Sequence, residues 1–134
     1  EKIIAKCNPD RYESYETATD WAGWLQEEYP IISQPTDGFS LRSTEDNSMT
    51  LVHAHGVFVY LNFLDNIRYF NEMIRVTKTN CTIIFDCYTE DCMTQEILDK
   101  WLKSKHNFPM VLPNDYIVQY YKKNNYKLKG LNQN

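Results

Sequence analysis

The sequence predicts an α/β fold in which a mainly parallel sheet is flanked by helices. Two runs rich in apolar and β-branched residues, 50–59 and 81–87, have the composition of buried strands. Helical patterns follow both runs, and this alternation implies the crossover connections that parallel strands require. With 134 residues and no linker-like stretch, the chain is expected to form one domain over residues 1–134.

The first third of the chain contains short structural signals. A helix is expected to end by residue 7, because the residue before the following proline disfavours the helical conformation. Aromatic and polar residues alternate over 11–17, which predicts a strand. An amphipathic helix is predicted over 21–28, and an extended run at 31–32 stops at the turn 35–38.

The strongest helical pattern begins at Asn62 or Asp65 and runs to about residue 77. Its expected inward face consists of apolar residues three and four positions apart: Leu64, Ile67, Phe70, Met73 and Ile74. Glu72 and Arg75 are three positions apart on this helix, so we expect them to pair. A turn at 79–80 then leads into the strand 81–87.

The last third is expected to hold two helices and a final strand. One helix covers 92–105, with four inward apolar residues: Ile97, Leu98, Trp101 and Leu102. Pro113 suits the first turn of the next helix, which Asn124 and Asn125 end. The strand is predicted over 126–131.

Charge is unevenly distributed along the chain, although the net charge is only −4. Residues 1–99 carry 17 Asp and Glu against 7 Lys and Arg, whereas residues 100–134 carry 7 Lys against Asp115 alone. The lysines are widely spaced and no arginine accompanies them. A solvated basic face is therefore expected, and nucleic acid is not an expected partner.

Two further patterns bear on location and metals. No run approaches the roughly 18 apolar residues of a membrane-spanning helix, so no membrane partner is expected. The four cysteines, at 7, 81, 87 and 92, show no paired CxxC spacing, which favours reduced thiols and a cytoplasmic protein. A zinc site built from Cys87, Cys92 and the histidines of 53–55 would lack the usual tight ligand spacing, so no metal is expected.

Parallel α/β sheets bind ligands at the carboxyl ends of their strands. The predicted ends carry the candidate site residues: Asp37, Gly38, His53, His55, Gly56 and Asp86. A histidine titrates near neutrality, so His55 could act as a general base for an oxygen or nitrogen nucleophile, or could simply hydrogen-bond and pack. Asp37 could bind a ligand or hold its own turn, and Gly56 permits a bend or a close approach of the backbone.

Four segments follow one another in an order that carries a resemblance. They are TDGFSL at 36–41, NSMTLV at 47–52, NEMIRVTK at 71–78 leading into IIFD at 83–86, and LPND at 112–115 through NYKL at 125–128. Together they resemble the later half of the class I, Rossmann-like S-adenosylmethionine-dependent methyltransferases. The resemblance covers about residues 31–131.

This resemblance implies a partial Rossmann-like fold and an enzyme that transfers a methyl group from S-adenosylmethionine to a small-molecule acceptor. It implies that Asp37 accepts a hydrogen bond from the adenine amino group. Gly38, His53 and Gly56 are the further cofactor-binding candidates, and His55 is the candidate catalytic base.

The chain also departs from the family pattern. Its glycines, at 23, 38, 56 and 130, allow no glycine-rich cofactor loop, and the acidic residue that ends the family's second strand is not found. By this resemblance the chain is expected to begin in the helix after that strand and to stop before the family's seventh strand, so a truncated domain is expected. The alternative is a non-catalytic scaffold without cofactor binding, whose exposed sheet edge would suit a homo-oligomer.

Overall fold

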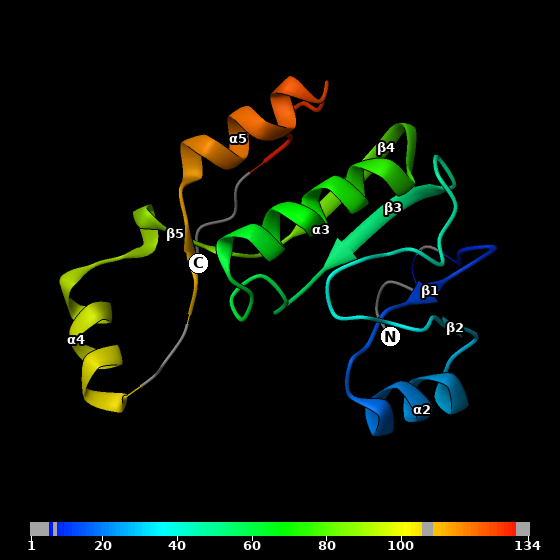
Figure 1. Cartoon of the computed structure of the whole chain (residues 1–134), viewed down its shortest axis with the longest axis horizontal. Helices are drawn as coiled ribbons and strands as arrows, with labels where there is room; N and C mark the ends of the chain where they lie inside the picture. Colours follow the sequence, from blue (N-terminus) through cyan, green and yellow to red (C-terminus); the bar gives the residue numbers. More distant parts are fainter. Residues whose placement is uncertain (1–5, 7, 106–108, 131–134) are drawn as a thin grey trace.

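The computed structural model describes residue 6, residues 8–105 and residues 109–130 (Figure 1). A helix end was predicted for residues 1–7. Apart from Lys6, these residues, Cys7 among them, lie outside the described part of the chain. The elements are β1 (Glu13–Ser14), α2 (Thr19–Glu28), β2 (Ile32–Ser33), β3 (Met49–Ala54), α3 (Phe63–Val76), β4 (Thr77–Phe85), β5 (Tyr88–Thr89), the 3₁₀ turn η1 (Glu90–Cys92), α4 (Gln95–Ser104), β6 (Val111–Leu112) and α5 (Asn114–Lys123).

The described strands form three parallel pairs: β1 with β2, β3 with β4, and β5 with β6. A helix connects the two strands of every pair, namely α2, α3 and α4 in turn. The α/β class and the crossover connections are therefore confirmed. The expected single sheet is not formed within the described part of the chain, because no ladder joins one pair to another.

The central unit β3–α3–β4 follows the sequence pattern most closely. The side chain of Asn62 accepts a hydrogen bond from the Asp65 backbone N–H at 3.0 Å and so begins α3 where it was predicted. Phe70 and Met73 are fully buried, as expected, but Leu64 is 66% exposed. The buried stripe shares Phe70 and Met73 with the predicted face and otherwise lies beside it. Its residues are Asn66, Tyr69, Phe70, Met73 and Val76.

Strand β4 begins earlier than predicted and contains an irregularity. Met49 pairs with Thr77, whereas Leu51 pairs with Thr82, so β4 has extra residues between the two pairs. Asn80 lies among them with a left-handed φ of 63°, a conformation that asparagine tolerates better than most residues. The turn predicted at 79–80 is therefore a bulge within a longer strand.

The core lies on one face of the β3–β4 pair. Its buried cluster combines residues after β3, on α3, on β6 and on α5: Phe58, Tyr69, Phe70, Met73, Leu112 and Ile117. Val52 and Phe85 pack against this cluster, while Leu51 and Ile84 on the opposite face are 36% and 50% exposed. Figure 1 shows α3 lying across the pair on the covered face.

Two expectations for the periphery are wrong, and one strand pair was not expected. Residues 126–130 form no strand; the Tyr126 hydroxyl instead hydrogen-bonds the Thr77 hydroxyl, and its ring packs on Tyr121. The pair β5–β6 was not predicted, because neither two-residue strand has a pattern of its own. On α4, Leu98 and Leu102 are exposed, since no described element covers that face of the helix.

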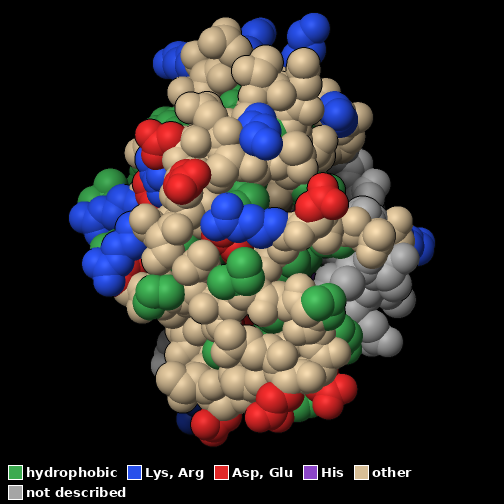
Figure 2. Space-filling model, turned by 90° about the vertical axis from the view of Figure 1, so that its right-hand side faces the viewer, with side chains coloured by type: hydrophobic (Ala, Val, Ile, Leu, Met, Phe, Trp, Pro, Cys, Tyr) green, Lys and Arg blue, Asp and Glu red, His purple; other side chains and the backbone are tan. Residues whose placement is uncertain are grey.

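The uneven charge is visible on the surface. Figure 2 shows acidic side chains at the lower end of the molecule, where α2 lies, and lysines and arginines toward the upper end. The exposed acids of α2 include Asp20, Glu27 and Glu28, and the last turn of α5 exposes Lys122 and Lys123. Cations in that turn complement the negative end of the helix dipole, which is a structural role.

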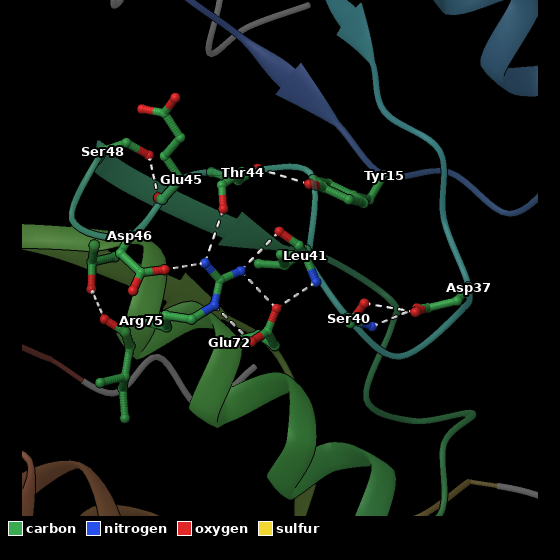
Figure 3. A network of polar contacts seen from close by, with 12 residues as sticks. Tyr15, Asp37, Ser40, Leu41, Thr44, Glu45, Asp46, Ser48, Glu72 and Arg75 are labelled. Carbon is green, nitrogen blue, oxygen red and sulfur yellow. Dashed lines mark hydrogen bonds and ion pairs between the residues drawn. The ribbon is translucent and has the colours of Figure 1, made fainter.

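Arg75, in the last turn of α3, ties the loop before β3 to the helix (Figure 3). Its Nε and Nη2 atoms donate to the two carboxylate oxygens of Glu72, each at 2.8 Å, which confirms the expected pair. Nη1 also donates to the Thr44 carbonyl at 2.9 Å and to Asp46 Oδ1 at 2.6 Å. Nη2 reaches the Leu41 carbonyl at 2.9 Å.

The same loop is attached to β1. The Thr44 hydroxyl donates to Glu13 and lies 2.8 Å from the Tyr15 hydroxyl. A continuous polar chain therefore runs from β1 through Thr44 and Arg75 to Glu72. Hydrogen bonds from Arg75 lower the pKa of Glu72, so the pair is ionised well into the acid range.

Replacing Arg75 with alanine is expected to destabilise the protein by about 2 kcal/mol or more, because charge-assisted hydrogen bonds to a half-buried group are lost. Urea unfolding measures this loss. The matched control is Arg68→Ala, which removes an exposed ion pair with Asp65 and should cost about 0.5 kcal/mol or less. Equal losses for the two variants would contradict the role of Arg75.

The stabilisation from Glu72 has a definite pH dependence. Its carboxyl pKa is lowered in the folded state, so this contribution is complete above the unfolded-state pKa and disappears as pH falls through the lowered value. Arg75→Ala should therefore remove part of the acid sensitivity of unfolding. An unchanged pH profile would contradict this.

Candidate functional site

Polar side chains follow the carboxyl ends of the first two parallel units, β1–α2–β2 and β3–α3–β4. Glu16 comes two residues after β1, and Asp37 four residues after β2. His55 and Asp86 directly follow the paired strands β3 and β4. Since parallel strands end at a common edge, each unit presents its own polar groups there.

Asp37 holds the turn in which it lies. Its Oδ1 atom accepts from the backbone N–H groups of Phe39 and Ser40, and Oδ2 accepts from the Ser40 hydroxyl at 2.7 Å. These bonds, that of the Ser40 side chain first, lower the pKa of Asp37. Gly38 has φ +83°, which explains the glycine there, and donates to the Thr36 hydroxyl at 3.1 Å.

Of the two interpretations left open for Asp37, the turn is therefore present in the structure. A carboxylate has about four lone-pair positions. The turn uses three of them, and the side chain is 20% exposed, with Arg42 4.0 Å from Oδ2. One acceptor position on Oδ2 is left, which is enough for a single donor group of a ligand.

Glu16 is a further candidate site residue, one that the sequence did not suggest. Its Oε1 atom accepts from the Ala18 backbone N–H at 2.9 Å, just before α2 begins. Within residues 8–105 and 109–130, no hydrogen bond to its Oε2 atom is found. The available signal was an acidic residue at the end of the alternating run 11–17, immediately before a predicted helix.

His55, Gly56 and Asp86 are brought into direct contact. His55 Nδ1 lies 2.5 Å from Asp86 Oδ2, and the Gly56 backbone N–H donates to Asp86 Oδ1 at 2.7 Å. Gly56 has φ +65°, the bend expected at this position. The His55 side chain is 80% exposed, so its other nitrogen is accessible to solvent.

His53 lies beside His55 on the same side of the strand, as the alternation of a strand predicts. The two rings are stacked with centroids 6.4 Å apart. His53 itself is within β3, where it pairs with Ile84. Its imidazole extends the exposed face of the sheet next to His55.

The Asp37 turn and the His55 contacts remain two separate groups, since no hydrogen bond or ion pair among the described residues joins them. Tyr69 of α3 lies between them in the packing. It contacts Phe58, just after the His55 bend, with ring centroids 6.0 Å apart. Burial, and next the negative charge of Asp37, raise the pKa of Tyr69.

Two carboxylate acceptors lie just past the ends of β1 and β2. Glu16 and Asp37 each offer one carboxylate acceptor position, which suits the hydroxyl and amino groups of a nucleoside. Their two strands are adjacent and parallel.

Among the described residues no group of three or more His, Cys, Asp or Glu side chains is arranged to hold a metal ion. A shallow surface hollow on α4 includes none of the site residues.

Comparisons with known proteins supply no assignment. No protein-family model matches the sequence, and no characterised protein is significantly similar to it. In the part of the chain that the structure describes, every helix is too short or too polar to cross a lipid bilayer.

Cys87, next to Asp86, is an unreactive thiol. Burial, and next the charge of Asp86, raise the pKa of Cys87 to about 11. Alkylation of Cys87 by iodoacetamide should therefore be much slower than that of free cysteine at neutral pH, and should accelerate as pH approaches that value. Mass spectrometry of the peptide measures the rate. Rapid labelling at neutral pH would contradict the raised pKa of this half-buried thiol.

Proposed function

We propose that the chain forms part of an S-adenosylmethionine-dependent methyltransferase domain, with a partial Rossmann-like fold, that acts on a small-molecule acceptor. The observation that supports this proposal most strongly is the series of parallel strand–helix–strand units. Polar side chains follow the strands of the first two units: Glu16 and Asp37 in one, His55 and Asp86 in the other. The order of motifs from residue 36 to residue 128 supports the same family. The three described cysteines are free thiols, which supports a cytoplasmic location.

Each site residue has a distinct role in this proposal. Glu16, two residues past the end of β1, takes the part of the acidic residue that ends the family's second strand. Asp37 accepts from the adenine amino group, and the left-handed Gly38 lets the turn approach the ligand. His53 and Gly56 border the cofactor, and His55 is the base. The sulfonium group, when bound, supplies an activated methyl group.

A binding module without catalysis is the second candidate. The chain exposes 9838 Å², whereas a compact monomer of 15.9 kDa exposes about 7,400 Å². Leu51 and Ile84 lie on the bare face of β3–β4, and β4 is the one described strand that pairs with β3. Such a surface suits a homo-oligomer or another partner. This candidate predicts no cofactor binding.

Calorimetric titration with S-adenosylhomocysteine tests the proposal on this chain. We expect saturable binding that Glu16→Gln and Asp37→Asn each weaken about tenfold, because each removes a charged acceptor for a ligand donor. Asp46→Asn is the matched control, since Asp46 is an exposed acid of the same loop that contacts Arg75.

The outcomes separate the two candidates. Unchanged affinity in Glu16→Gln and Asp37→Asn would remove these residues from the site. Absence of binding by the unmodified chain would contradict the methyltransferase proposal and favour the binding module.

A further inference from the structure

Asp86 is held through both carboxylate oxygens. Oδ1 accepts from the Gly56 N–H at 2.7 Å and Oδ2 lies 2.5 Å from His55 Nδ1. The Asp86 backbone N–H donates to the Ala54 carbonyl at 3.3 Å, which continues the β3–β4 ladder past its last pair. The carboxylate is therefore fixed to the sheet at one end and to the bend after β3 at the other.

This contact determines which ring nitrogen of His55 carries the proton. An ionised carboxylate is only an acceptor, so the nitrogen facing it must carry a hydrogen. In the neutral imidazole that hydrogen is on Nδ1, which leaves the lone pair on Nε2. Because the side chain is 80% exposed, Nε2 is open to an incoming group.

We propose that Asp86 is a positioning residue for His55, and that the pair selects a methyl acceptor that must lose a proton, namely a neutral hydroxyl or amine. This inference rests on the proposed function. A carboxylate acceptor has no proton to give to Nε2 and would approach the negative charge of Asp86. The pair therefore favours hydroxyl or amine acceptors over acidic ones.

The chain's own residues can take up the proton that the acceptor loses. The hydrogen of the acceptor O–H passes to Nε2, and the electron pair of that bond remains on oxygen as the nucleophile. The imidazole lone pair forms the new N–H bond, and the resulting imidazolium is stabilised by the Asp86 carboxylate. Gly56 keeps the carboxylate in place through its N–H.

Nitrogen-15 NMR at alkaline pH, where the rings are neutral, measures the tautomers directly. We expect the Nδ1–H form at His55 in the unmodified chain and the Nε2–H form in Asp86→Asn, whose amide has the same shape. An amide oxygen that accepts from Gly56 turns its NH₂ toward Nδ1, and this excludes a proton there. His53, which is in the same chain, is the internal control and should not change.

Phenol and anisole, a matched pair with and without a hydroxyl, probe the acceptor class. Phenol should shift the His55 Nε2 resonance of the unmodified chain, anisole should not, and Asp86→Asn should lose the response. An Nε2–H tautomer in the unmodified chain, or equal shifts with both probes, would overturn the inference.

Failure of this inference is distinguishable from failure of the proposed function. An Nε2–H tautomer in a chain that binds S-adenosylhomocysteine overturns the role of Asp86 alone. An Nδ1–H tautomer and a phenol response in a chain that binds no S-adenosylhomocysteine support the positioning role and overturn methyl transfer together with the acceptor class.

Discussion

The arrangement of the units β1–α2–β2 and β3–α3–β4 depends on the hydrogen bonds of the Arg75 guanidinium. The guanidinium contacts Glu72 on its own helix and carbonyls of the loop before β3, and that loop is attached to β1 through Thr44 (Figure 3). The unit β1–α2–β2 buries no side chain of α2. A charged network therefore joins this unit to the rest where apolar packing is sparse. Such a junction depends on geometry and ionisation more than on buried area.

The apolar core has a different distribution. It is concentrated around α3, where Phe58, Phe70 and Phe85 contact one another with ring centroids 5.0 to 5.4 Å apart. The β3–β4 ladder is consequently the most firmly supported part of the fold, and it carries the His55–Asp86 contact at its end. A site built on a rigid strand pair maintains its geometry better than one on a loop, whereas Asp37 depends on its own turn.

The sequence predicted the elements whose signals are local. The cap at Asn62 and the three-and-four spacing that follows it located α3. The pair β5–β6 could not be predicted, because two-residue strands 23 positions apart in their register leave no pattern. Glu16 was overlooked for another reason: the strand was predicted over 11–17, which places Glu16 inside it, whereas β1 ends at Ser14 and leaves Glu16 beyond its end. His55 and Asp86 were each candidates, but their contact follows from the Ala54–Phe85 register, which a sequence pattern does not contain.

Chemically, the two groups of site residues complement one another: carboxylates with an open acceptor position on the first unit, and a carboxylate-held imidazole on the second. In the function that we propose, one ligand contacts both groups of residues. Amide shift mapping of the labelled chain with S-adenosylhomocysteine tests it most directly. We expect amide shift changes confined to the segments that follow β1, β2 and β3, namely residues 16–18, 36–40 and 53–56. Perturbations on α4 alone, or at none of these segments, would contradict it.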